Sequence, residues 1–327
     1  MKDIKKVFVS VGQGSQYRGM GYELYKHNNI FKSSIEESET IIQKHLKRSL
    51  IEELYAANDT KFDDLLITHP AIVAVEIAMY EVLKSLGILP DYILGNSLGE
   101  FAAGVVAEIW NAKSAIEASI IQAKCIEKSG IIGKGGMIAV IDQEQLLDKN
   151  SFLAYNLYLA SNNFDGHYTI SGLNDDLENF QNFLKKQNIS FIRLPVKVPF
   201  HSPLIDKSLL DFKKYLSVFG SIKQQPNQKF ISGLKCTEVV VISDDYFAQV
   251  VSKHINFSKS VDYIQGKGDF LYIDIGPSGT GSTFVNYNLK NTHNYSKTFS
   301  IMSPFKKENE KLIELQEILK ANNSYVY

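Results

Sequence analysis

The chain has 327 residues, 44% of them hydrophobic, which is enough to bury a sizeable core in one large domain or two medium ones. Its 35 basic and 36 acidic side chains give a formal net charge of −1, so the basic excess that nucleic-acid binding needs is absent. The two cysteines, Cys125 and Cys236, lie far apart and outside any CxxC spacing, which predicts no disulfide framework and no zinc site and fits a reducing cytoplasm.

The N-terminus carries no pattern typical of export. Residues 1–6 include four charged side chains and lead straight into a short strand-like run, so we expect no signal peptide. The nearest approach to a long apolar window is at residues 93–110, where Glu100 and Glu108 interrupt it. We therefore expect no membrane span.

The first elements are a strand, a loop and helices. Residues 7–11 form a short apolar run typical of a buried parallel strand, and a glycine-containing loop, GQGSQ at 12–16, follows it. Helical periodicity continues to about residue 54. A further helix is predicted to start with Thr68 and His69 at its cap and Pro70 in its first position, and to end at Gly87.

A second buried strand is predicted at 91–94, followed by a tightly packed, alanine-rich helix at 98–106, with Ser97 on the turn between them. Further strands are predicted at 136–141, 168–172, 190–196, 229–232 and 270–275, with helical patterns such as 176–187 between several of them. The layout predicts an α/β fold with a parallel sheet. Elements follow more closely at 133–198, as in a ferredoxin-like unit inserted into a larger domain made of 1–132 and 199–327.

Residues 95–99, GNSLG, match the pattern G-x-S-x-G in the place that this motif requires, after a strand and before a helix. The flanking glycines allow a tight turn that exposes the Ser97 hydroxyl, and the amide of Leu98 is directed at the site where an oxyanion would form. A glycine-flanked turn without catalytic function is the alternative. The strand-turn-helix context favours a nucleophile.

A serine nucleophile needs a base, and His201 is the best-placed of the seven histidines. It follows a strand end, after Phe200, at the sheet edge where ligand sites of α/β proteins collect. Polar helical, turn or cap surroundings favour solvated or capping roles for the others: His27, His45, His69, His167, His254 and His293. A purely structural role for His201 is the alternative.

The loop at 12–16 is the candidate for the second oxyanion donor. Gly12 and Gly14 allow a backbone N–H to approach the substrate oxygen closely, and the amide of Gln13 is the predicted donor. A phosphate loop is excluded because the spacings of both common phosphate-binding motifs are absent. Glycine clusters at 130–136 and 276–281 lack these spacings too and are interpreted as turns.

Four motifs in register resemble the malonyl-CoA:acyl-carrier-protein transacylase family, and most closely the free-standing acyltransferases and acyl hydrolases of polyketide synthases. The motifs are GQGSQ at 12–16, GNSLGE at 95–100, FHSPL at 200–204 and DIGP at 274–277. The resemblance extends over about residues 7–304. It implies an α/β-hydrolase-like large subdomain with a ferredoxin-like insert and a ping-pong reaction by a Ser–His pair without a catalytic carboxylate.

The resemblance also implies a role for each site residue. Ser97 attacks a thioester, His201 moves the proton, and the amides of Gln13 and Leu98 hold the oxyanion. A backbone carbonyl, expected at Asn256, orients the histidine. No cofactor or metal is expected to be bound, because the substrates carry phosphopantetheine on an acyl carrier protein or on CoA, and polyketide synthase modules are the expected partners.

Three positions of the acyl pocket depart from the family. The arginine that grips the malonyl carboxylate is replaced by Gln122, the histidine before the nucleophile by Asn96, and a pocket glutamine by His69. An amide cannot neutralise a carboxylate, and Lys124 lies two positions along the helix, on a different face. Together with Phe200, these residues predict a remodelled pocket that disfavours malonyl.

The leading hypothesis is therefore an editing hydrolase that removes non-malonyl acyl groups from acyl carrier protein through an acyl-Ser97 ester. Alternatives are a transacylase that loads malonyl or another acyl group from CoA onto the carrier, and an inactive scaffold that binds carrier proteins.

Overall fold

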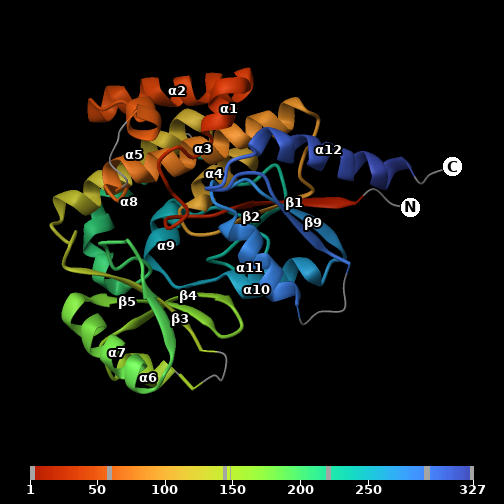
Figure 1. Cartoon of the computed structure of the whole chain (residues 1–327). Helices are drawn as coiled ribbons and strands as arrows, with labels where there is room; N and C mark the ends of the chain where they lie inside the picture. Colours follow the sequence, from red (N-terminus) through yellow and green to blue (C-terminus); the bar gives the residue numbers. More distant parts are fainter. Residues whose placement is uncertain are drawn as a thin grey trace.

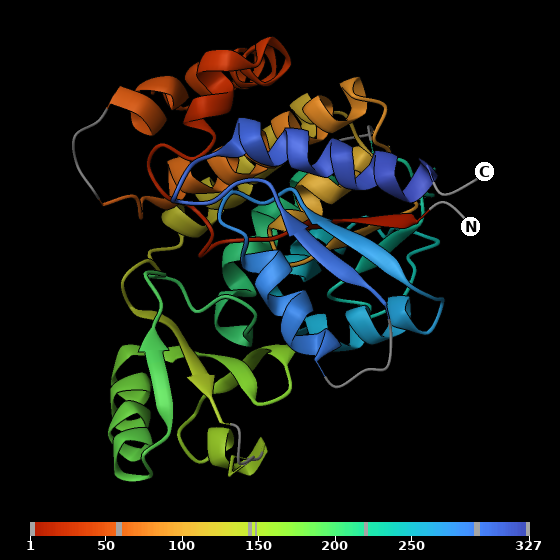
Figure 2. The same cartoon turned by 45° about the vertical axis from the view of Figure 1, so that its right-hand side comes forward.

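The computed structural model describes residues 4–56, 61–142, 146–147, 149–218, 222–290 and 295–324. Two five-stranded sheets organise these residues into a large and a small lobe (Figure 1). The turned view shows the small lobe, around β3 to β6, below the large one (Figure 2). The predicted fold class, a parallel sheet with a smaller ferredoxin-like unit, is confirmed.

The large sheet has the strand order β10-β9-β1-β2-β7, and every neighbouring pair is parallel. Its strands are β1 (Lys5–Ser10), β2 (Tyr92–Gly95), β7 (Phe230–Ser232), β9 (Phe270–Asp274) and β10 (Lys297–Ser300). Ser10 lies opposite Gly95, so the loop after β1 and the turn after β2 leave the sheet at the same edge. That edge is where α/β proteins place their ligands.

Alternation along β1 builds a core on both faces of this sheet. Phe8 joins the larger apolar cluster, whereas Val7 and Val9 join the cluster on the opposite face, and all three are fully buried. Helices that contribute to the larger cluster are α2 (Asn29–Leu46), α3 (Leu65–Ser85), α4 (Gly99–Val106), α5 (Ala112–Lys128), α8 (Leu210–Val218), α9 (Tyr246–Ser252) and α12 (Glu308–Ser324). Helices α10 (Phe257–Gln265) and α11 (Thr280–Leu289) cover the other face, and the short α1 (Tyr22–His27) precedes α2.

The small sheet has the order β6-β3-β5-β4-β8. Its strands are β3 (Gly135–Ile141), β4 (Tyr158–Phe164), β5 (His167–Leu173), β6 (Ser190–Arg193) and β8 (Ile255–Asn256), accompanied by α6 (Lys149–Leu153) and α7 (Asn174–Lys186). An apolar core of its own, including Ile138, Ile170 and Phe180, lies beneath α7. We propose to keep 133–198 as the smaller unit and 1–132 with 199–327 as the larger, with β8 of the larger unit pairing in parallel with β4.

The helix predicted to begin at Pro70 begins five residues earlier. Asp64 caps α3 by accepting from the amide of Leu66, which leaves Pro70 inside the helix and places His69 in its second turn. The hydrogen bond accepted by Asp64 and the burial of the helix compensate for the backbone hydrogen bond that Pro70, which has no N–H, cannot donate. This helix, and not 93–110, is also the one long and apolar enough to cross a membrane among the described residues, but its apolar window is 89% buried inside the protein. It is a core helix.

Candidate active site

The turn that carries Ser97 is shaped by close backbone contacts. Ser97 has a left-handed backbone with φ of 54°, a conformation that non-glycine residues rarely adopt. A Cβ added at Gly99 would lie 2.5 Å from the backbone of Ser10, and one added at Gly95 would lie 2.8 Å from Glu100. The glycines of the motif are therefore required by packing, which lets α4 start directly against β1 and presents the serine above the sheet edge.

Ser97 and His201 lie together although 104 residues separate them in the chain. The distance between Ser97 Oγ and His201 Nε2 is 2.8 Å, and His201 is 5% exposed. Burial lowers the pKa of His201 to about 4, so the imidazole is neutral near pH 7. This is the geometry that a serine nucleophile and its general base require.

The carbonyl that orients the His201 ring belongs to Lys253, which follows α9. His201 Nδ1 donates to it at 3.0 Å, and since a carbonyl can only accept, Nε2 is left unprotonated to receive the Ser97 proton. The prediction of Asn256 for this contact is corrected. Asn256 begins α10, where its side chain caps the amide of Lys259, while the C-terminal carbonyl of α9 faces the ring.

The loop after β1 lies against the Ser97 turn. A Cβ added at Gly12 would be 2.8 Å from the Leu98 nitrogen and 3.1 Å from Ser97 Oγ, so only glycine leaves space beside the predicted oxyanion donors. The buried carboxyl of Glu76 holds this loop by accepting from the amide of Val11 at 2.7 Å. Burial raises the pKa of Glu76 well above its ordinary value, and Asp274 nearby adds to the effect.

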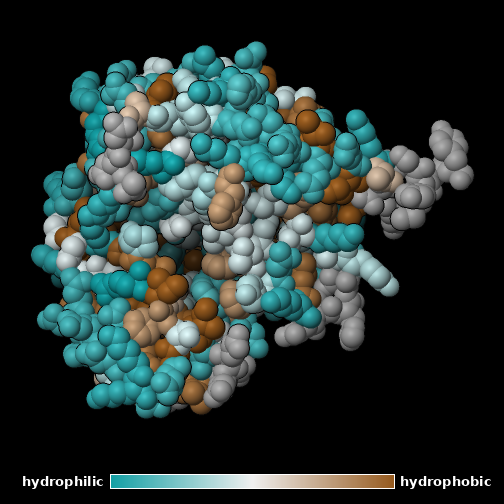
Figure 3. Space-filling view, in the orientation of Figure 1, coloured by the Kyte–Doolittle hydropathy of each residue, from teal (hydrophilic) through white to brown (hydrophobic). Residues whose placement is uncertain are grey.

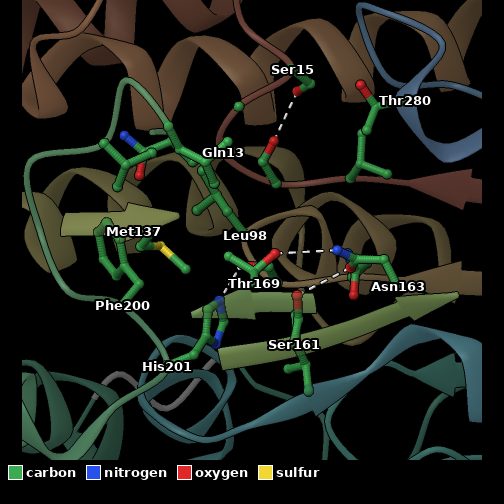
Figure 4. A pocket seen from close by; sticks show the side chains of 18 of the residues that line it. Gln13, Ser15, Leu98, Met137, Ser161, Asn163, Thr169, Phe200, His201 and Thr280 are labelled. Atoms are coloured by element: carbon green, nitrogen blue, oxygen red, sulfur yellow. Dashed lines mark hydrogen bonds between the residues drawn. The ribbon is translucent and has the colours of Figure 1, made fainter. Parts of the chain in front are cut away.

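A cavity of about 190 Å³ opens in front of Ser97, between the lobes. Figure 3 shows the hollow on this face, with apolar side chains along its lower rim. The large lobe contributes Gln13, Leu98 and Phe200 to the wall, and strands β3 to β5 contribute the opposite side. In the close view, Met137 and Phe200 lie on one side, and Ser161 and Asn163 on the other (Figure 4).

Gln122 does not line this cavity, contrary to its prediction as a pocket residue. It is fully buried on α5 behind His69, whose Nδ1 lies 2.7 Å from Gln122 Oε1 and whose Nε2 lies 3.2 Å from Gln13 Oε1. Burial lowers the pKa of His69 to about 4, so the ring is neutral. A neutral imidazole offers one donor and one acceptor, so it can donate to only one of these two oxygens, and the other amide must rotate by about 180° to place its NH2 against the ring. His69 therefore closes the route from α5 to the cavity.

The other three predicted pocket residues, His69, Asn96 and Phe200, do line the cavity. The Phe200 ring packs against His69 with centroids 5.5 Å apart. Asn96 is 6% exposed, and its Oδ1 has no hydrogen-bond partner among the described residues. Lys124, by contrast, points away and donates to the carbonyl of His45 at 2.8 Å.

Sequence reasoning missed the polar wall of the small lobe. Asn163 Nδ2 lies 2.9 Å from His167 Nδ1 and donates to Thr169 at 3.2 Å, while Ser161 donates to Asn163 Oδ1 at 3.1 Å. His167, interpreted from sequence as a turn residue, lies on β5. Polar residues spaced two apart in a strand were the available signal, since they share one face. No group of three or more His, Cys, Asp or Glu side chains in the described ranges is placed to hold a metal.

Comparison with known proteins finds a family model and relatives that match nearly the whole chain. Residues 7–319 match the family model described as acyl transferase domain. The chain is 36% identical over 305 residues to the polyketide biosynthesis acyltransferase homolog PksD of Bacillus subtilis (strain 168), with 92% of this chain and 93% of that protein covered. It is 32% identical over 314 residues to the homolog BaeD of Bacillus velezensis, with 95% of each covered.

Solved structures share the fold. An acyltransferase domain from the second module of the salinomycin polyketide synthase superposes with a TM-score of 0.84 at 24% identity, covering 95% of this chain and 72% of that one. The malonyl CoA-acyl carrier protein transacylase of Clostridium perfringens superposes with a TM-score of 0.82 at 24% identity, covering 97% and 98%. The fold of this chain is thus shared with both groups.

Proposed function

This chain belongs to the acyl transferase domain family, and on that premise we propose that it processes acyl thioesters of polyketide biosynthesis through an ester on Ser97. The observation that carries the proposal is the 2.8 Å contact between Ser97 Oγ and His201 Nε2, with Nδ1 held by Lys253. The acyl groups arrive on the phosphopantetheine thiol of an acyl carrier protein or of CoA, and the chemistry needs no bound cofactor. Partners of this kind are supplied by polyketide synthase modules in the cytoplasm.

The first half-reaction forms the ester. His201 Nε2 takes the Ser97 proton as Oγ attacks the thioester carbon, and the amides of Gln13 and Leu98 stabilise the negative charge on the former carbonyl oxygen. As the C–S bond breaks, the proton passes from His201 to the departing thiolate. The products are acyl-Ser97 and the free carrier thiol.

The second half-reaction regenerates Ser97. His201 takes a proton from water, the resulting hydroxide adds to the ester, and the proton returns to Ser97 Oγ as the carboxylic acid leaves. A phosphopantetheine thiol in place of that water would give acyl transfer by the same proton path. We propose hydrolysis as the main outcome, so that the enzyme frees carriers from acyl groups that stall assembly.

The acyl group is proposed to be uncharged. No lysine or arginine belongs to the cavity wall within the described part of the chain, and His69 is neutral because of its burial. A malonyl carboxylate would therefore lose water without gaining a cationic partner, a cost of at least several kcal/mol. Acetyl and other acyl groups without a carboxylate carry no such cost.

The proposal is tested by incubating the protein with carrier protein loaded with acetyl or malonyl and following the carrier's intact mass. We expect acetyl-carrier to revert to the free thiol much faster than malonyl-carrier, and Ser97→Ala to abolish both reactions. An acetyl adduct on the peptide containing Ser97 would identify the intermediate. Equal release of malonyl, or release by Ser97→Ala, would refute the proposal.

A transacylase is the second candidate, because both half-reactions share the acyl-enzyme. It predicts that malonyl moves from CoA to free carrier protein with little loss to water. A scaffold without activity predicts no Ser97 adduct with any thioester.

A further inference from the structure

Glu100 is a fully buried carboxyl group three residues after Ser97 in the first turn of α4. Its Oε1 accepts from Ser232 Oγ at 2.9 Å and from the amide of Leu234 at 3.2 Å, and its Oε2 accepts from the hydroxyl of Tyr246. Its own amide donates to the carbonyl of Ser97 at 2.9 Å. One carboxyl group thus joins the Ser97 turn, the end of β7 and helix α9.

Helix α9 also holds His201, at its opposite end. The amide of His201 donates to the carbonyl of Val251 at 3.0 Å, and His201 Nδ1 donates to the carbonyl of Lys253 at 3.0 Å. Tyr246 is the first residue of this helix and Lys253 follows its last. Six helical residues, 247–252, therefore separate Tyr246, which contacts Glu100, from Lys253, which holds the imidazole.

The apolar contacts of this helix are less directional than its hydrogen bonds. The Phe247 ring stacks on Trp110 with centroids 3.8 Å apart and meets Phe101 edge-on at 5.2 Å. Such ring contacts resist separation, but they tolerate sliding and rotation more readily than hydrogen bonds do. Burial of a carboxyl group is costly, and here it raises the pKa of Glu100 to about 7. The three hydrogen bonds that Glu100 accepts offset this cost and fix the relative positions of the segments they join, which an apolar side chain could not do.

We propose that Glu100 is a positioning residue that sets the distance between Ser97 and His201 by anchoring α9 through Tyr246. The inference rests on the proposed function, since the distance matters only if the two residues react together. A displacement of about 1 Å between reacting groups can reduce a rate about 100-fold. Substrate binding does not involve Glu100, because it lies beneath the turn and outside the cavity wall.

The variant Tyr246→Phe removes the link and leaves Glu100 in place. Tyr272→Phe is the matched control, because Tyr272 is equally buried and its hydroxyl accepts from Gln265, away from His201. We expect Tyr246→Phe to lower the rate of Ser97 acylation by an acetyl thioester roughly 10- to 100-fold with KM within about twofold, and Tyr272→Phe to keep the wild-type rate. Glu100→Gln, which puts an NH2 in place of one carboxylate oxygen, should also lower the acylation rate and leave KM nearly unchanged. The double variant Glu100→Gln/Tyr246→Phe should be little slower than either single variant.

A spectroscopic readout separates positioning from general destabilisation. The proton on His201 Nδ1 should give a downfield NMR resonance, identified by its loss in His201→Gln, that shifts in Tyr246→Phe and not in Tyr272→Phe. An unshifted resonance, or an acylation rate within about twofold of wild type, overturns the inference, as does a rise in KM with kcat unchanged. If the wild-type protein forms no acyl-Ser97, the proposed function fails and the resonance alone decides this inference. If Glu100→Gln does not fold, Tyr246→Phe decides it.

Discussion

An arginine introduced at position 122, where the resemblance of the sequence leads us to expect a malonyl-binding arginine, should bind malonyl only after a second change at His69. Gln122 is 0% exposed and lies 2.7 Å from His69 Nδ1, so an arginine there would face a neutral ring and have no route to the cavity. A buried guanidinium without a counter-charge costs about 3–5 kcal/mol, which predicts that Gln122→Arg alone lowers the thermal stability and gains no malonyl activity.

The double variant His69→Gln/Gln122→Arg removes the ring that blocks the route. Two charge-assisted hydrogen bonds to a malonyl carboxylate contribute at least about 3 kcal/mol, or roughly 150-fold in relative kcat/KM. The assay is competition between malonyl and acetyl thioesters of N-acetylcysteamine, with acyl-Ser97 identified by mass. His69→Gln alone is the control and should keep the preference for acetyl.

Two results would refute this reasoning. A malonyl-to-acetyl ratio that changes less than about threefold in the folded double variant would show that position 122 has no access to the acyl group. Efficient malonyl turnover by Gln122→Arg alone would show that His69 does not block it.

Three further predictions concern the reaction centre. Ser97→Ala should reduce thioester cleavage at least about 1,000-fold in a carrier-mass assay, while the melting temperature stays near that of the wild type because alanine keeps the Cβ that strains the left-handed backbone. Residual turnover at one tenth of wild type would exclude Ser97 as nucleophile. Gly12→Ala should lower kcat roughly 100- to 1,000-fold with little change in KM, since its Cβ would lie 2.8 Å from the Leu98 nitrogen; a rise in KM alone would argue against an oxyanion site there. Because burial lowers the pKa of His201 to about 4, the imidazole should stay neutral down to about pH 5 and gain a proton only below that, and kcat/KM of Glu100→Gln, which lacks the carboxyl group that titrates near pH 7, should be level over the same range. A His201 NMR titration with its midpoint near pH 6.5 would contradict the buried, neutral base.

The sequence was most informative where a local pattern determines local geometry. The strand, turn and helix around Ser97 follow from small residues beside a nucleophile, and β1, β2 and β9 follow from short apolar runs. Strands β4, β8 and β10 were missed. The two-residue β8 forms only because β4 lies beside it, a contact between residues about 95 positions apart that no local pattern encodes.

In the candidate site, too, local geometry could be predicted from the sequence, whereas contacts between distant segments could not. The pairing of Ser97 with His201 was expected, but the reason given for His201 was wrong, because β6 ends at Arg193, eight residues before it, and His201 lies in no strand. The carbonyl that orients the ring was assigned to Asn256 instead of Lys253. That choice depends on where α9 ends. Similarly, the position of Gln122 behind His69 depends on the start of α3, which the Asp64 cap moves five residues upstream of Pro70.

The two lobes have different roles in the candidate site. The large lobe carries the dyad, with Ser97 and the loop at Gly12 at the sheet edge and His201 held by the end of α9. The short parallel pairing of β8 with β4 fixes the small lobe close to the segment that orients His201. The small lobe then supplies the polar wall around Asn163 that faces Ser97 across the cavity. Changes on β4 and β5 can thus alter which thioester fits without moving the reacting atoms, whereas changes at the sheet edge alter the chemistry itself.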